Sequence, residues 1–234
     1  MRLLIATSVS LIFSMSVFAQ DSKSSPKSKD LSESPARTAA AVDVGLYEKR
    51  IRDFTEMLKH DSANERLYAA RGQSYINVGK FDEAIADLSF AIKANPQRQA
   101  YYAVRGDAFL KSNQYKKALD DYTMAIKSGP ANHYLYSHQA SAAVLMKDYK
   151  TAEGAAKAAL RLEPNDVITL GLLGGVQRGL GKYDDALKIV NKAIDLAPRD
   201  ASLLRLRSEL YTELGKSDLA RRDLDASNSL RCLD

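Results

Sequence analysis

Three histidines and three adjacent pairs of acids are the residues whose chemistry could form a metal or catalytic site. His133 and His138 are five residues apart, which places them on different faces of a helix, and His60 is distant in sequence. The acid pairs lie near the starts or on the outer faces of expected helices, where the helix dipole and water account for them. They are Asp82 with Glu83, Asp120 with Asp121, and Asp184 with Asp185. We therefore predict no metal and no catalytic activity.

Glycines between Gly171 and Gly181 are the other feature that could hold a small molecule. They follow no expected strand and miss the spacing of phosphate-binding loops, so we expect no nucleotide and no cofactor. The formal net charge is +5, and the Lys and Arg residues are interspersed with acids. Nucleic-acid binding requires a clustered basic face, so it is not expected either.

The elements that must position these residues recur at a constant interval of 34 residues. A period of this length, with small residues and prolines in phase, predicts a solenoid of helix pairs. In the first unit, Glu65 to Asn77 and the amphipathic run that begins at Phe81 are the two expected helices, and Pro96 ends the second. The phased residues are Gly72, Ala84, Ala91, Pro96; Gly106, Ala118, Ala125, Pro130; Ala140, Ala152, Ala159, Pro164; Gly174, Ala186, Ala193, Pro198; and Ser208, Ala220, Ser227.

With these residues, the sequence resembles the tetratricopeptide repeat family. The resemblance is carried by Tyr68, Gly72, Tyr75, Ala84, Leu88, Ala91 and Pro96, and by the residues at the same phase in the later repeats. It implies an all-α fold, a right-handed α-solenoid of antiparallel helix pairs with about eleven helices. The expected units are 65–98, 99–132, 133–166, 167–200 and 201–234, the last including the C-terminal cap.

Residues 43–62 precede the first unit and carry an apolar stripe of helical period from Val44 to His60. Stepping back one period from Phe81 leads to Tyr47, so this segment is expected to be a half repeat that caps the open end of the stack. Two alternatives are an amphipathic helix that binds a membrane or a partner, and a surface for self-association. The oligomeric state is left open.

The first residues differ in kind from the repeats. Residues 1–19 combine Arg2, an apolar run and a small-residue cleavage site at Ala19, which predicts a secretory signal peptide; an uncleaved membrane anchor is the alternative. Residues 20–42 are rich in Ser, Lys and Ala, which predicts a disordered linker. We expect a periplasmic or secreted protein without stable membrane insertion after cleavage. Cys232 is the only cysteine, so no intramolecular disulfide can form.

The resemblance also implies that the first helices line a concave groove for a peptide or protein partner. The middle of that groove would be small, neutral and polar, which suits a peptide backbone, with Tyr134 as the expected anchor. Carried over by phase, the groove residues are Arg66, Ala69, Gln73, Asn77, Ala103, Asp107, Lys111, Tyr134, Ser137, Ser141, Gly171, Gly175, Arg178, Arg205 and Glu209.

One subtype of the family does not fit. Members that hold the acidic tails of cytosolic chaperones use Lys, Asn and Arg at places that correspond here to Ala69, Gln73, Val104, Tyr134 and His138. The leading expectation is an exported, non-enzymatic adaptor that binds its partner in the groove. The alternative is a structural subunit of a cell-envelope assembly, such as secretion, pilus or outer-membrane machinery, held through its convex face and helix ends.

Overall fold

A computed structural model describes residues 44–231, which contain eleven α-helices and no strand within that range. The predicted signal peptide (1–19), the linker (20–42) and Cys232 lie outside the described residues. The helices are α1 Val44–His60, α2 Glu65–Asn77, α3 Phe81–Ala94, α4 Gln99–Lys111, α5 Tyr115–Ser128, α6 His133–Leu145, α7 Tyr149–Leu162, α8 Val167–Gly179, α9 Tyr183–Leu196, α10 Ala201–Glu213 and α11 Ser217–Arg231.

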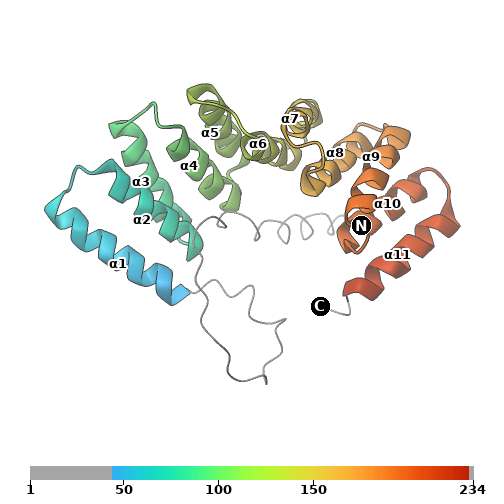
Figure 1. The fold of residues 1–234 in the computed structure, drawn as a ribbon, viewed down its shortest axis with the longest axis horizontal. Coiled ribbons are helices and arrows are strands. Elements are labelled where there is room, and N and C mark those ends of the chain that lie inside the picture. The colour runs from blue at the N-terminus through green and yellow to red at the C-terminus, as the bar shows by residue number, and fades with distance from the viewer. Residues whose placement is uncertain (1–43, 232–234) are drawn as a thin grey trace, which may run out of the picture. The chain divides into compact units, whose positions relative to one another are not determined.

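Each helix packs against the helix before it and the helix after it (Figure 1). The pairs α2–α3, α4–α5, α6–α7, α8–α9 and α10–α11 are called repeats 1 to 5, and α1 covers the open side of repeat 1. First helices also approach the first helix of the next repeat, as α6 does with α8 and α8 with α10, so they line the inner side of the bend. The prediction of an all-helical solenoid is confirmed.

The turn inside each repeat depends on one residue in the left-handed region. Gly79, Gly181 and Gly215 have φ between 71° and 76°, and Asn113 and Lys147 adopt φ of 61° at the same phase. Glycine takes this conformation without steric cost, whereas a lysine there is uncommon. The turn is therefore conserved in geometry across the five repeats even where its residue type is not.

Close packing within a repeat requires a small residue where its two helices cross, and repeats 1, 2 and 4 have glycine there. A Cβ added to Gly72 would lie 3.0 Å from Leu88 Cγ, and one added to Gly106 would lie 2.9 Å from Tyr122 Cε1. The second helices present fully buried alanines near these crossings. These alanines are Ala84, Ala118, Ala152 and Ala186.

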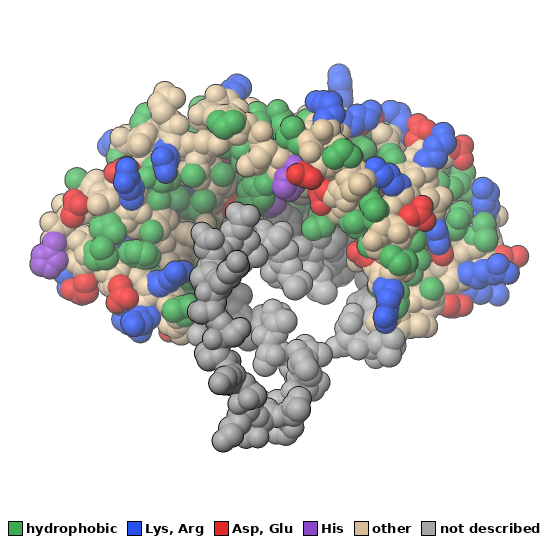
Figure 2. Space-filling view, in the orientation of Figure 1, with side chains coloured by type: hydrophobic (Ala, Val, Ile, Leu, Met, Phe, Trp, Pro, Cys, Tyr) green, Lys and Arg blue, Asp and Glu red, His purple; other side chains and the backbone are tan. Residues whose placement is uncertain are grey.

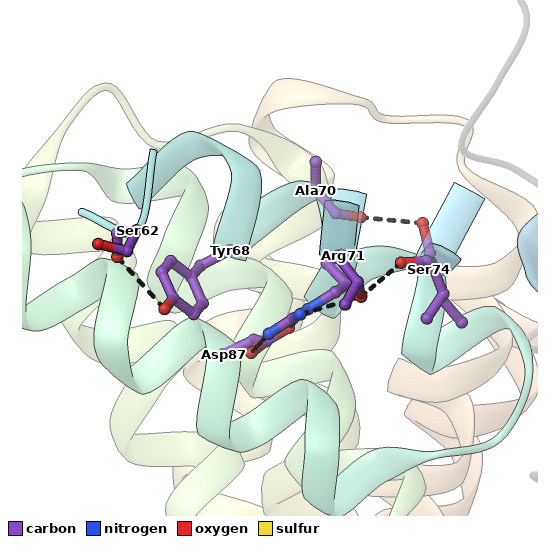
Figure 3. A network of polar contacts seen from close by, with 8 residues as sticks. Ser62, Tyr68, Ala70, Arg71, Ser74 and Asp87 are labelled. Carbon is purple, nitrogen blue, oxygen red and sulfur yellow. Dashed lines mark hydrogen bonds and ion pairs between the residues drawn. The ribbon is translucent and has the colours of Figure 1, made fainter. Parts of the chain in front are cut away.

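Buried ion pairs tie the two helices together in repeats 1, 2 and 5. In repeat 1, Arg71 Nε and Nη2 donate to the two carboxylate oxygens of Asp87 at 2.7 and 2.8 Å (Figure 3). The remaining nitrogen, Nη1, donates to Thr55 Oγ1 of α1 at 3.1 Å. Arg105 makes the same contacts with Asp121 and Ser89, and Arg207 makes them with Asp223 and Asn191.

Repeats 3 and 4 lack this ion pair. Gln139 takes the place of the arginine in repeat 3 and donates only to Thr123 Oγ1, at 3.0 Å. Leu173 takes it in repeat 4 and is buried in an apolar cluster with Ala155, against which Ile189 packs. Repeats 1, 2 and 5 thus add an ion pair to their apolar contacts, whereas repeats 3 and 4 do not.

This network corrects one prediction from the sequence. Asp121 was expected to be explained by the helix dipole and solvation, but it is buried, with 5% of its surface exposed, and paired with Arg105. Its neighbour Asp120 is exposed and pairs with Lys116 one turn away at 2.8 Å. Only one acid of the Asp120–Asp121 pair is therefore a surface residue.

We expect Asp121→Ala to lower the free energy of unfolding by about 3–5 kcal/mol, because it leaves the guanidinium of Arg105 buried without its carboxylate. The double variant Arg105→Leu with Asp121→Ile copies repeat 4 and should remain within about 1 kcal/mol of the parent. Urea denaturation followed by circular dichroism measures both. Equal losses in the two variants would contradict the account.

Candidate functional site

The predicted groove residues all lie on the first helices, but they differ in accessibility. Arg66 and Lys111 are exposed, and Ser137 is buried with 7% of its surface accessible. The others are half-buried, and their role in binding stays a prediction; they are Ala69, Gln73, Asn77, Ala103, Asp107, Tyr134, Ser141, Gly171, Gly175, Arg178, Arg205 and Glu209.

Asp107 is the centre of a compact cluster between repeats 2 and 3. Tyr122 of α5 donates its hydroxyl to Asp107 Oδ1 at 2.7 Å, and Tyr134 of α6 donates to Oδ2 at 2.5 Å. Burial raises the pKa of both phenols well above the usual value, and the negative charge of Asp107 raises them further. Both tyrosines therefore stay neutral and act as hydrogen-bond donors.

His138 completes the cluster. Its ring lies 3.9 Å from the ring of Tyr134, centroid to centroid, and meets the ring of Tyr122 edge to face at 5.7 Å. Its Nδ1 lies 3.0 Å from the carbonyl oxygen of Tyr134, one turn back on α6. Burial lowers the pKa of His138, and the charge of Asp107 offsets part of that effect. Tyr134 is therefore a partner within a network rather than the free anchor that the sequence predicted.

Other predicted groove residues are also engaged with neighbours. Arg178 of α8 pairs with Glu209 of α10, which links the inner sides of repeats 4 and 5. Ser137 Oγ donates to Thr169 Oγ1 at 2.9 Å, because the one hydroxyl hydrogen of Thr169 goes to the Asp166 carboxylate; the buried hydroxyl of Ser137 therefore has a partner. The structure thus brings Asp107 together with Tyr134, and Arg178 together with Glu209.

The glycines of α8 separate into two kinds. A Cβ at Gly171 would lie 2.9 Å from Leu203 Cδ2, at Gly174 2.4 Å from Val190 Cγ2, and at Gly179 2.7 Å from the ring of Tyr149. These three glycines are explained by packing. A Cβ at Gly175 would meet nothing within 4 Å, and the same holds for Gly154 in α7. Gly175 is the member of the predicted groove whose side chain is absent without a packing reason.

Among the acids of residues 44–231, Glu153 has the most strongly lowered pKa. Its contacts with neighbouring side chains account for this shift. Its Oε1 accepts from Lys157 at 2.6 Å and from Gln177 at 2.9 Å. These hydrogen bonds, with the charges of Lys157 and Lys182, lower its pKa to about 2. A carboxylate held in this way is a weak base at neutral pH.

The described residues offer no metal cluster, since no three His, Cys, Asp or Glu side chains gather within residues 44–231. None of the helices in that range is both long and apolar enough to cross a membrane. On the face shown in Figure 2, basic and acidic side chains are interspersed, with apolar side chains scattered between them.

The Asp107 cluster was missed by sequence reasoning, although a signal was present. Asp107 and Tyr134 were both predicted groove residues, but nothing joined them to Tyr122 or His138. At the phase of Tyr122 the other repeats carry Leu88, Ala156, Val190 and Leu224. A tyrosine at a buried helix crossing must place its hydroxyl on a polar partner, and this requirement was the available clue.

Comparisons with known proteins agree with the fold of paired helices in five repeats. Two family models described as tetratricopeptide repeat match the chain, over residues 69–133 and 143–225. The structure of YrrB, described as a TPR protein with an unusual peptide-binding site, is similar with a TM-score of 0.65 at 20% identity, covering 76% of this chain and 91% of YrrB. The structure of MamA from residue 41 to its end, from Desulfovibrio magneticus RS-1, gives a TM-score of 0.69 at 18% identity, covering 73% of this chain and 96% of that fragment.

A chain of the APC/C hetero-tetramer Cut9–Hcn1 gives a TM-score of 0.65 at 18% identity, covering 82% of this chain and 38% of that one. At these identities the likeness concerns the fold alone. Comparison with curated proteins gives no match.

The lowered pKa of His138 predicts how stability depends on pH. As pH falls below the ordinary value of 6.5, the unfolded chain binds a proton at this residue before the folded protein does. The free energy of unfolding should therefore decrease from about pH 7 downward until His138 also titrates in the folded state. Urea titrations between about pH 5 and 7.5 measure the slope, which His138→Gln should reduce. The same substitution at exposed His60 is the control, and a slope that survives His138→Gln would assign the effect to another group.

Proposed function

The chain belongs to the tetratricopeptide repeat family, and we propose on this basis that it is a non-enzymatic adaptor that binds a peptide segment of a partner protein on its inner surface. Proteins of this family are generally protein-binding scaffolds, and one of the similar structures, YrrB, is described as having a peptide-binding site. The first helices present that surface, and no metal cluster gathers within residues 44–231.

The observation that carries this proposal is Gly175. A glycine inside a helix costs about 0.5–1 kcal/mol relative to alanine, and here no neighbour requires its absence of a side chain. It faces open space at the same phase as Ser141 of the preceding repeat, near the middle of the predicted groove. A bare helix backbone at this place lets the main chain of a bound peptide lie close.

We also propose that the adaptor is exported and meets its partner in the periplasm or outside the cell. The support is the sequence of residues 1–19, where a basic start, an apolar run and a small-residue cleavage site follow one another.

A structural subunit held through its outer surface is the second candidate. Phe90 of α3 and Met124 of α5 stand at the same phase of successive second helices and are 39% and 41% exposed. Large apolar side chains exposed in register are typical of contact surfaces. This candidate predicts a partner complex that is insensitive to changes on the inner surface.

Gly175→Gln distinguishes the two candidates, with Gly154→Gln as its matched control. Both changes replace a helix glycine that has open space around it, and Gly154 is exposed on the second helix α7. Both should raise the free energy of unfolding by about 0.5–1 kcal/mol. Only Gly175→Gln should weaken binding of peptides selected by the parent protein from a random-peptide phage library, by about tenfold or more, which corresponds to 1.4 kcal/mol.

The readout is fluorescence polarisation of the selected peptides, together with affinity capture from the cell-envelope fraction. Peptides that bind the parent, Gly175→Gln and Gly154→Gln equally well would show that the inner surface at Gly175 is not the peptide-binding site. A captured complex that also tolerates both substitutions would favour the structural subunit.

A further inference from the structure

We propose that the inner surface recognises a basic side chain, lysine or arginine, of the bound peptide, and that Asp107 is the residue that binds it. This inference rests on the proposed peptide-binding function and adds to it the chemistry of the ligand.

Asp107 is unusual among the acids of this protein. Three buried acids, Asp87, Asp121 and Asp223, each pair with an arginine. Among half-buried acids, Glu65, Glu153 and Glu209 pair with a Lys or Arg, while Asp166 and Asp200 cap the N-termini of α8 and α10. Asp107 is half-buried in the interior of α4, and within residues 44–231 it has no Lys or Arg at ion-pair distance and no capping role, while the ring of His138 lies within reach of its charge. Among the half-buried acids of residues 44–231, Asp107 is thus the one that neither pairs with a Lys or Arg nor caps a helix.

The two phenols hold this carboxylate without neutralising it. Tyr122 and Tyr134 fix both oxygens at hydrogen-bond distance, so the carboxylate is oriented before any ligand arrives. A group that is already oriented loses little entropy on binding. Because Asp107 is partly removed from water, an incoming cation interacts with it more strongly than with a fully solvated acid. The geometry therefore favours a charged hydrogen-bond donor over a neutral one.

The surroundings favour the long, partly apolar side chain of a lysine or arginine. The ring of Tyr134, whose hydroxyl meets the carboxylate, lies against the ring of His138 at a tilt of 35°, and aromatic rings attract both alkyl stems and cationic heads. Along the same row of the inner surface, Gln73, Ser141 and Gly175 carry no charge, and Glu209 is paired with Arg178. Asp107 thus provides a single point of negative charge along an otherwise neutral row.

Lys111 is the nearest competitor for Asp107, because it lies one turn further along α4 and is exposed. The ion pairs within residues 44–231 include none between Lys111 and Asp107. Exposed pairs of this spacing contribute only about 0.3–0.5 kcal/mol, so a bound cation can displace such a contact easily. Removing Lys111 should therefore strengthen the binding of a basic peptide or leave it unchanged.

The experiment starts from peptides that the parent protein selects from a random-peptide phage library. Lysine or arginine should be enriched at one position of the aligned peptides. A representative peptide and its copy with norleucine in place of that residue are then measured against the parent, Asp107→Asn, Lys111→Ala and the outer-surface control Asp120→Asn. The copy with norleucine changes only the ligand, so the test does not depend on how well any variant folds.

We expect the norleucine peptide to bind the parent about tenfold more weakly or worse, which corresponds to 1.4 kcal/mol. Asp107→Asn should lose affinity for the basic peptide to a similar extent and no longer distinguish the two peptides, whereas Asp120→Asn should behave as the parent does. Selected peptides without enrichment of Lys or Arg, or equal discrimination by Asp107→Asn, would overturn this inference and leave peptide binding intact. A loss of affinity in Lys111→Ala would also overturn it. Failure to select any peptide would instead refute the proposed function itself.

Discussion

The two helices of a repeat pack closely because the first helix carries a small residue at the crossing, which is glycine in three of the five repeats. These glycines, Gly72, Gly106 and Gly174, lie against Leu88, Tyr122 and Val190. In repeat 2 the consequence reaches the inner surface, because the ring of Tyr122 lies across Gly106 and its hydroxyl meets Asp107. The proposed binding residue is therefore oriented by the same close approach that stabilises the repeat.

The periodic features were predictable from the sequence because they depend on residue type alone. Small residues at helix crossings and prolines after second helices repeat with the chain, and α2 and α3 begin at Glu65 and Phe81 as their spacing indicated. Contacts that occur in one repeat only were not predictable in this way. The Asp107 cluster depends on which side chain fills the space above one glycine, and no periodic signal describes that choice.

The ion pairs within repeats 1, 2 and 5 were only partly predictable from the sequence. Arg71 and Asp87 are sixteen residues apart, and both types recur together and disappear together along the chain. This joint pattern is visible in the sequence, but its meaning requires the side chains to face each other across the helix pair. In the central repeats, apolar contacts between Leu173 and its neighbours replace the charges. Such replacement is compatible with stability, because an ion pair that is removed as a whole leaves no unpaired charge.

The contact that each arginine makes with the preceding repeat bears on how such a chain can change in length. The side chains of Thr55, Ser89 and Asn191 differ, but each accepts a hydrogen bond from the Nη1 nitrogen of its arginine. An arginine at this phase therefore accommodates different acceptors on the helix before it. A repeat that carries the arginine could be gained or lost with this contact kept, provided that the preceding helix offers a polar side chain at that place.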